Sequence, residues 1–193
     1  MRVIAGKYRS RPLYSLRGLD LRPTSDRLRE TLFDVLTAGN PAALEGTVWV
    51  DLFAGTGAVG IEAISRGAAM VYFVESSRRA VELIRRNLHS LGIETGFQIL
   101  QQDSVRVGHT LSEVQVDGVF LDPPYRLEPA YRQTLEALSE SRLLKPESMV
   151  IAEHQKKFDP GERIGSLQRY RLLKQGDAVL SFYRAFARPP RNS

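Results

Sequence analysis

Cysteine is absent from the 193 residues of the sequence, so disulfides, thiolate zinc sites and cysteine nucleophiles are all excluded. Histidine is scarce, and His89, His109 and His154 are too scattered to form a pair at metal-ligand spacing, so no metal is expected. No apolar run approaches the ~20 residues that cross a bilayer. The first residues also lack the apolar stretch of a signal peptide. These absences predict a cytoplasmic protein without a membrane partner.

Basic residues give the chain a net charge of +5, and this excess is concentrated near the N-terminus. Residues 1–30 contain eight Lys or Arg and three acids, which leaves 19 bases and 19 acids in the rest of the chain. Basic residues interspersed with Tyr8 and Tyr14 suit an arm that contacts RNA phosphates, although a basic run alone is also typical of a solvated terminus. The residues expected to bind RNA are Arg2, Lys7, Arg9, Arg11, Arg17, Arg22 and Arg27.

Hydrophobic patterning divides the chain into an N-terminal segment and an α/β body. The segment has strand-like runs at residues 2–4 and 11–14, and then a helix with Thr24 as its expected N-cap. In the body, short apolar strands alternate with helices, which indicates a parallel sheet covered on both faces. The expected strands cover residues 47–52, 70–74, 97–100, 119–121 and 148–152, and the expected helices cover 58–66, 78–91 and 129–138.

Near the C-terminus the pattern changes. Two strand-like runs, 169–174 and 178–186, flank Gln175-Gly176-Asp177 and predict an antiparallel hairpin. The predicted fold is a doubly wound, mostly parallel α/β sheet with a C-terminal hairpin and a basic N-terminal extension. Nothing in the sequence suggests an obligate dimer, so we expect a monomer. The expected parts are an RNA-contacting arm and helix over residues 1–40, the main domain over 41–187, and a tail over 188–193.

A glycine loop, Gly55-Thr56-Gly57-Ala58-Val59-Gly60, lies between an expected strand and helix, as in dinucleotide-binding proteins. Glu75 follows Gly55 by twenty positions, where an acid would meet ribose hydroxyls. Asp51 lies four residues before Gly55, at the strand end where open α/β sheets bind ligands. A pyrophosphate there would face a like charge. S-adenosylmethionine carries an ammonium and a sulfonium instead, and an acidic loop favours both.

Asp103 adds an acid after the third strand, placed to accept from an adenine amino group. Its alternative role is a helix cap, and close packing is the alternative role of Gly60. Acids at the ends of three consecutive strands suit a cationic, ribose-bearing cofactor. The expected cofactor-binding residues are Asp51, Phe53, Ala54, Gly55, Thr56, Gly57, Glu75, Ser76, Asp103, Ser104 and Asp122.

The sharpest local motif is Asp122-Pro123-Pro124-Tyr125. An exocyclic amine on a base is a poor nucleophile because its lone pair is delocalised into the ring. Asp122 and the Pro123 carbonyl would accept its two hydrogens and direct the lone pair at a methyl group, and proline holds the turn with its fixed φ. Tyr125 offers a stacking face for an unpaired or flipped base. These four residues are the expected catalytic residues.

Together these motifs resemble the class I methyltransferases that modify amino groups. Arg2-Val3-Ile4-Ala5-Gly6, the run from Arg22 to Glu30 and Gly60-Ile61-Glu62-Ala63 further resemble the RsmD family, bacterial 16S ribosomal RNA guanine-N2 methyltransferases. The similarity extends from Arg2 to about Phe186. It implies a seven-stranded sheet, S-adenosylmethionine as cofactor, a guanine N2 target in 16S ribosomal RNA, and a partly assembled small subunit as substrate.

Other functions share parts of this pattern. DNA adenine-N6 and protein glutamine methyltransferases carry a similar tetrad, but the sequence has no separate target-recognition domain, and a basic arm does not suit a glutamine substrate. A non-catalytic RNA-binding assembly factor would not need an intact tetrad with Asp51. A nicotinamide dehydrogenase is disfavoured by Asp51 and by the lack of a substrate domain.

Overall fold

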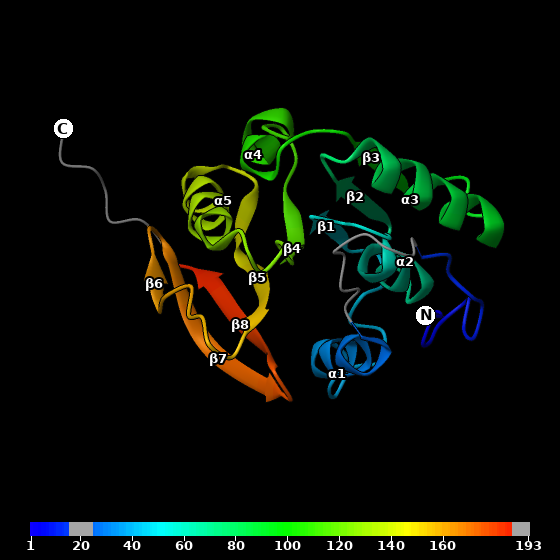
Figure 1. The fold of residues 1–193 in the computed structure, drawn as a ribbon, viewed down its shortest axis with the longest axis horizontal. Helices are drawn as coiled ribbons and strands as arrows, with labels where there is room; N and C mark the ends of the chain where they lie inside the picture. Colours follow the sequence, from blue (N-terminus) through cyan, green and yellow to red (C-terminus); the bar gives the residue numbers. More distant parts are fainter. Residues whose placement is uncertain (16–24, 187–193) are drawn as a thin grey trace.

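The computed structural model describes residues 1–15 and 25–186, and in them one mixed sheet runs through the molecule. Its strands are β1 (Val48–Leu52), β2 (Met70–Val74), β3 (Phe97–Leu100), β4 (Val116–Leu121), β5 (Leu144–Gln155), β6 (Arg163–Ile164), β7 (Leu167–Gln175) and β8 (Ala178–Ala185). The strand order is β3-β2-β1-β4-β5-β8-β7-β6 (Figure 1). The strands from β3 to β5 pair in parallel, and β8 runs antiparallel to both β5 and β7.

Helices cover both faces of this sheet. They are α1 (Asp26–Leu36), α2 (Ala58–Ser65), α3 (Arg78–Leu91), α4 (Val107–Thr110), α5 (Glu128–Glu140) and the 3-10 helix η1 (Ser104–Arg106). Alternate side chains of each strand enter one of two hydrophobic clusters. Trp49 and Phe73 pack in the cluster with α1, α2 and α3, whereas Val50 and Val74 pack in the cluster with α5.

The doubly wound sheet and its C-terminal hairpin are therefore confirmed, with one strand more than the expected seven. The additional strand β6 has two residues, too few for an alternating pattern to be detected. The predicted N-cap of α1 is wrong, because Ser25 caps the helix and its Oγ accepts from the Leu28 amide at 3.1 Å. Thr24 itself lies outside the described residues. Over residues 1–15 and 25–186, no helix is long and apolar enough to cross a membrane.

The N-terminal arm (residues 1–15) docks on α2 through a buried acid. Glu62 is 0% exposed, and its two carboxylate oxygens accept from the amides of Ile4 at 2.7 Å and Ala5 at 2.9 Å. Two arginines balance its charge: the Nε of Arg66 lies 2.8 Å from the carboxylate, and that of the buried Arg29 on α1 lies 3.9 Å away. One carboxylate thus ties the arm, α1 and α2 together.

Removal of this carboxylate should destabilise the fold strongly. Glu62→Ala leaves two arm amides without their acceptor and removes a counterion of the buried Arg29, and breaking such a buried network costs about 3–5 kcal/mol. Urea denaturation measures the free energy of unfolding. The exposed pair Arg78–Glu82 provides the control, because Glu82→Ala should change stability by less than ~1 kcal/mol. Equal losses in the two variants would contradict the importance of the buried acid.

Candidate active site

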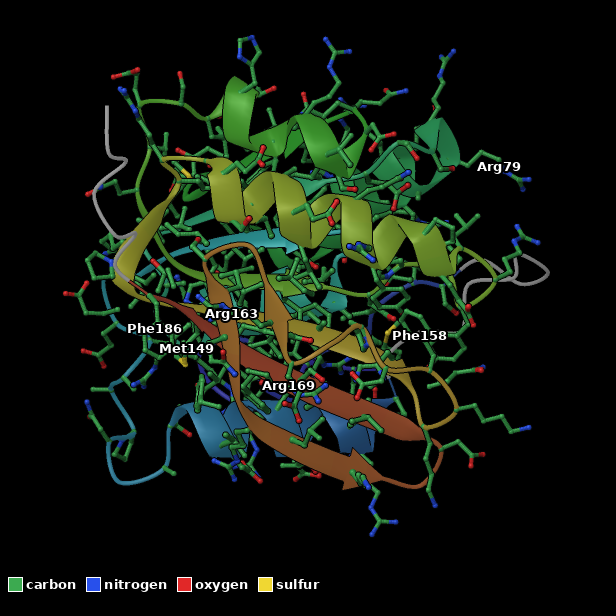
Figure 2. The ribbon with its side chains drawn as sticks, turned by 90° about the vertical axis from the view of Figure 1, so that its left-hand side faces the viewer. Arg79, Met149, Phe158, Arg163, Arg169 and Phe186 are labelled. Carbon is green, nitrogen blue, oxygen red and sulfur yellow. The ribbon has the colours of Figure 1, made fainter. Side chains whose placement is uncertain are left out.

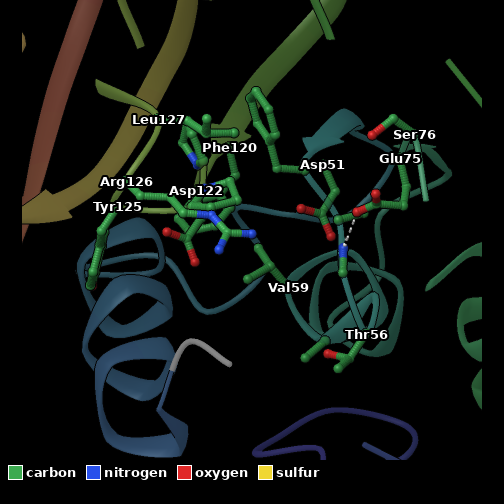
Figure 3. Close-up of a pocket in the computed structure, with 16 residues that line it drawn as sticks. Asp51, Thr56, Val59, Glu75, Ser76, Phe120, Asp122, Tyr125, Arg126 and Leu127 are labelled. Atoms are coloured by element: carbon green, nitrogen blue, oxygen red, sulfur yellow. Dashed lines mark hydrogen bonds between the residues drawn. The ribbon is translucent and has the colours of Figure 1, made fainter. Parts of the chain in front are cut away.

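A pocket of about 360 Å³ opens at the carboxyl ends of β1, β2 and β4 (Figure 3). This is the edge at which open α/β sheets bind their ligands. Acids from three strand ends share it: Asp51 lies near the end of β1, Glu75 follows β2, and Asp122 follows β4. The lining residues are Asp51, Phe53, Ala54, Gly55, Thr56, Ala58, Val59, Glu75, Ser76, Phe120, Asp122, Pro123, Pro124, Tyr125, Arg126 and Leu127.

The glycine loop makes a tight turn from β1 into α2. Gly57 has φ 76° and serves as the N-cap of α2, a left-handed conformation that glycine adopts without strain. A Cβ on Gly60 would lie 2.3 Å from Cε1 of Phe73, so glycine at this position lets α2 pack directly on β2. The close packing considered for Gly60 is thus present. The loop also brings the N-terminus of α2 to the pocket.

Asp51 is the most perturbed acid of the pocket. The residue is 3% exposed, and its Oδ2 accepts from the Gly60 amide at 2.9 Å. Burial raises the pKa of Asp51 to about 8, although the hydrogen bond from Gly60 opposes the shift, and the nearby Glu75 carboxylate adds to it. Without a ligand, the carboxyl is therefore mostly protonated at neutral pH. A cation bound beside Asp51 would stabilise its ionised form.

Glu75 binds the glycine loop from the neighbouring strand. One carboxylate oxygen accepts from the Gly55 amide at 2.9 Å, and the other accepts from the Ser77 amide at 2.8 Å. Each oxygen has a second lone pair, so these bonds leave room for hydroxyl donors. Because both bonds fix the carboxylate at the pocket wall, Glu75 connects the loop after β1 to the start of α3.

A second pocket, of about 300 Å³, adjoins the first and shares Phe53, Glu75, Ser76 and Leu127 with it. Asp103 and Ser104 lie here. Asp103 is the N-cap of η1 and accepts from the Val105 amide at 3.1 Å, so the capping role considered for it is present. Ser104 is buried, and its hydroxyl contacts that of Thr134 on α5 at 3.0 Å. The second pocket extends the site along the strand ends towards β3.

The tetrad lies across the first pocket from Asp51 and Glu75 (Figure 3). The hydroxyl of Tyr125 lies 3.4 Å from a carboxylate oxygen of Glu153, an acid of β5 that is 4% exposed. The hydroxyl of the buried Tyr131 on α5 donates to the Pro123 carbonyl at 3.2 Å. Burial and the charge of Asp122 raise the pKa of Tyr131, which keeps this donor protonated. Both contacts hold the tetrad in position.

Known proteins match the chain along almost its whole length. A family model described as "Conserved hypothetical protein 95" matches residues 1–184. YlbH from Bacillus subtilis is 32% identical over 95% of this chain and 98% of its own length. Ribosomal RNA small subunit methyltransferase D from Haemophilus influenzae is 31% identical, with 96% of this chain and 93% of that protein covered. The chain belongs to the RsmD family. The solved structure of yhhF from Escherichia coli superposes with a TM-score of 0.81 at 28% identity, covering 97% of this chain and 99% of that one.

Most residues that the sequence predicted for an RsmD-family site lie together. The first pocket includes the four tetrad residues, and Asp51, Phe53, Ala54, Gly55, Thr56, Glu75 and Ser76. Asp103 and Ser104 line only the second pocket, and Gly57 lines neither. The sequence missed Phe120, Arg126, Leu127 and the supporting pair Tyr131 and Glu153. None of these belongs to a glycine or tetrad motif. Phe120, Arg126 and Leu127 flank the tetrad in the sequence, whereas Tyr131 on α5 and Glu153 on β5 reach it only through folding.

None of the described residues expected to contact RNA lines the first or the second pocket. Arg2, Lys7, Arg9 and Arg11 are exposed on the N-terminal arm, and Arg27 is exposed on α1. Arg17 and Arg22 lie outside the described residues. Among the residues that the structure does describe, no group of three His, Asp or Glu could hold a metal ion.

Proposed function

We propose that the protein transfers a methyl group from S-adenosylmethionine to the exocyclic N2 amine of a guanine in 16S ribosomal RNA. The observation that carries this proposal is the shared pocket, in which Asp51 and Glu75 lie across from the tetrad. The name of the Haemophilus influenzae relative, a ribosomal RNA small subunit methyltransferase, supports the substrate class. The proposed substrate is a partly assembled small subunit, on which the protein acts as a cytoplasmic monomer.

The residues of the two pockets fit S-adenosylmethionine. The buried Asp51, with its raised pKa, favours a cation beside it and suits the ammonium of the methionine part. Glu75 would accept from ribose hydroxyls, while Asp103 in the adjoining pocket would accept from the adenine amino group. When bound, S-adenosylmethionine supplies an electrophilic methyl group on its sulfonium. A pyrophosphate cofactor does not fit, because it would meet Asp51.

The tetrad would prepare the amine for attack. Asp122 and the Pro123 carbonyl would each accept one amine hydrogen, so the nitrogen would become pyramidal. Its lone pair would then form the new nitrogen–carbon bond as the methyl–sulfur bond breaks. The amine hydrogen held by Asp122 would leave the nitrogen late as a proton, and Asp122 is its proposed acceptor. Tyr125 stacks on the base, and Glu153 holds its hydroxyl. Most of the rate enhancement would come from positioning and electrostatics.

Tyr131→Phe should slow the chemical step without weakening binding. The Tyr131 hydroxyl occupies one lone pair of the Pro123 carbonyl, which leaves the second for the amine and fixes its direction. Its loss should lower kcat about tenfold, in the range of a positioning effect, with KM and cofactor affinity unchanged. Steady-state kinetics on small-subunit particles measures both parameters.

A matched control for this variant is available in the hairpin. Tyr183 is also buried, and its hydroxyl donates to the Gly161 carbonyl at 2.8 Å, away from the tetrad. Tyr183→Phe makes the same chemical change and should leave kcat intact. If both variants lost activity equally, packing and not the Pro123 carbonyl would explain the effect of Tyr131.

The proposed function is tested by offering methyl-labelled S-adenosylmethionine with several acceptors. The acceptors are small-subunit particles from cells that lack the protein, naked 16S RNA, duplex DNA and a glutamine-containing protein. We expect label in the RNA of the particles. Label in DNA or in protein would overturn the substrate. Failure to bind S-adenosylmethionine, with RNA binding retained, would support a non-catalytic assembly factor.

A further inference from the structure

The exposed face of α3 is positively charged, although basic and acidic residues are equal in number over residues 31–193. Arg78, Arg79, Arg85 and Arg86 are exposed on it, against the single exposed acid Glu82. Glu82 pairs with Arg78 at 3.2 Å, so it neutralises only the start of the helix. Arg79 projects away from the body in Figure 2. The face therefore presents a row of guanidinium groups to solvent.

The N-terminal arm extends this charge, because it docks against the second half of α3. The Arg11 guanidinium donates to the Ser90 carbonyl at 3.1 Å. Asn87 is fully buried, and its side chain accepts from the Tyr14 amide at 2.7 Å and donates to the Tyr14 carbonyl at 3.1 Å. A pocket of about 260 Å³ forms along the contact, lined by Arg11, Pro12, Leu13, Tyr14 and Ser90. Arm and helix thus form one surface.

Tyr14 stands on this surface as a fixed aromatic platform. The Arg86 guanidinium lies over its ring, 3.7 Å from the centroid, and Tyr14 is still 45% exposed. Its backbone is held on both sides by Asn87, so the ring does not need to become ordered when a ligand binds. An exposed aromatic ring beside arginines is the usual arrangement for stacking an unpaired base and contacting its phosphate.

We propose that the surface formed by Arg11, Tyr14 and Arg86 binds an unpaired segment of the substrate RNA, with a base on Tyr14 and phosphates at the two arginines. This inference rests on the proposed function for the identity of the RNA. It adds an RNA contact on α3 that lies outside the first pocket. Charge favours RNA over a protein partner, because α3 and the arm together offer several guanidinium groups and few acids.

A hydrogen-bonded side chain connects this surface to the glycine loop of the first pocket. Besides both backbone bonds to Tyr14, the Asn87 side chain donates to the carbonyl of Thr56 at 2.9 Å, and Thr56 lines the first pocket. One buried side chain therefore separates the Tyr14 platform from the glycine loop. RNA held at Tyr14 would stay beside the pocket while a neighbouring part of the same molecule reaches the tetrad.

Three substitutions in the full-length protein test the proposal: Tyr14→Ala, Arg86→Ala and Tyr14→Phe. Binding to naked 16S RNA and to a single-stranded oligoribonucleotide of about ten nucleotides is measured over a salt series. Tyr14→Ala and Arg86→Ala should each weaken binding about fivefold or more, and Arg86→Ala should lower the salt slope by about one. Tyr14→Phe keeps the ring and should bind normally. Ultraviolet cross-linking should attach RNA to the tryptic peptide that contains Tyr14.

Arg132→Ala is the matched control, because it removes one exposed arginine from α5, on the other face of the sheet. It should change RNA affinity by less than about twofold. Equal effects of Arg86→Ala and Arg132→Ala, or normal binding by Tyr14→Ala, would overturn the proposal. A defect seen with particles but not with naked RNA would also overturn it, in favour of a ribosomal-protein contact. S-adenosylmethionine affinity and kcat at saturating substrate test the proposed function separately and should stay unchanged in all four variants.

Discussion

Asp122→Ala is expected to abolish methyl transfer while S-adenosylmethionine still binds. Asp122 lies on the tetrad side of the pocket, across from Asp51 and Glu75, which are proposed to bind the cofactor (Figure 3). Its removal deprives the target amine of one hydrogen acceptor and of its proposed proton acceptor. Loss of both roles should reduce kcat by about a thousandfold or more. Calorimetry should find cofactor affinity within about threefold of wild type.

Two further variants serve as an intermediate case and as a control. Asp122→Asn retains one oxygen acceptor but cannot take up the proton, so it should be slower than wild type and faster than Asp122→Ala. Asp177→Ala removes an exposed acid at the hairpin turn and should leave kcat unchanged. Turnover near the wild-type rate in Asp122→Ala would contradict the mechanism.

Asp51→Asn should strongly weaken cofactor binding and at the same time stabilise the ligand-free protein. Asparagine keeps an oxygen for the Gly60 amide but loses the charge that the cofactor ammonium is proposed to need. Truncation of a buried charge pair costs a few kcal/mol, so cofactor affinity should fall about a hundredfold or more. Calorimetry measures this loss, and affinity close to wild type would contradict the role of Asp51.

The change in stability follows from the raised pKa of Asp51. The folded protein keeps the proton up to about pH 8, whereas the unfolded chain loses it near its ordinary value of 3.8. Between these pH values the folded state binds one more proton, so the wild-type free energy of unfolding falls as pH rises. Asp51→Asn lacks this slope. It should be close to wild type near pH 4 and exceed it by about 4–5 kcal/mol at pH 8. Equal stability across this range would show that Asp51 is ionised without a ligand.

The same pKa predicts that cofactor binding releases a proton. At pH 7, ligand-free Asp51 is mostly protonated, and a cation beside it would favour ionisation. Calorimetry in two buffers of different ionisation enthalpy should therefore detect the release of close to one proton, and none in Asp51→Asn.

Sequence reasoning succeeded wherever a local pattern determines structure. The apolar run at residues 70–74 and the amphipathic run at 78–91 became β2 and α3 with the predicted bounds, because periodicity alone specifies such elements. The glycine loop and the tetrad were also found as local motifs. Parallel strands all end at one edge of the sheet, so acids at the carboxyl ends of β1, β2 and β4 were expected at that edge.

Contacts between distant segments could not be predicted in this way. Tyr131 was expected only as part of a helix, and its bond to the Pro123 carbonyl depends on how α5 packs against the turn. Glu62 lies in an apolar helix, and no local pattern indicates that the N-terminal arm supplies its donors. Asn87 likewise joins Tyr14 and Thr56, 73 and 31 positions away. Such long-range hydrogen bonds leave no periodic signal in the sequence.

The most direct test of the proposed reaction identifies the methylated nucleoside. Small-subunit particles from cells that lack the protein are incubated with it and methyl-labelled S-adenosylmethionine, and the RNA is then digested and separated by chromatography and mass. We predict that the label is in N2-methylguanosine and is absent with Asp122→Ala. Label in N6-methyladenosine would retain the amine chemistry but contradict the guanine target, and unlabelled RNA despite bound cofactor would contradict the proposed reaction.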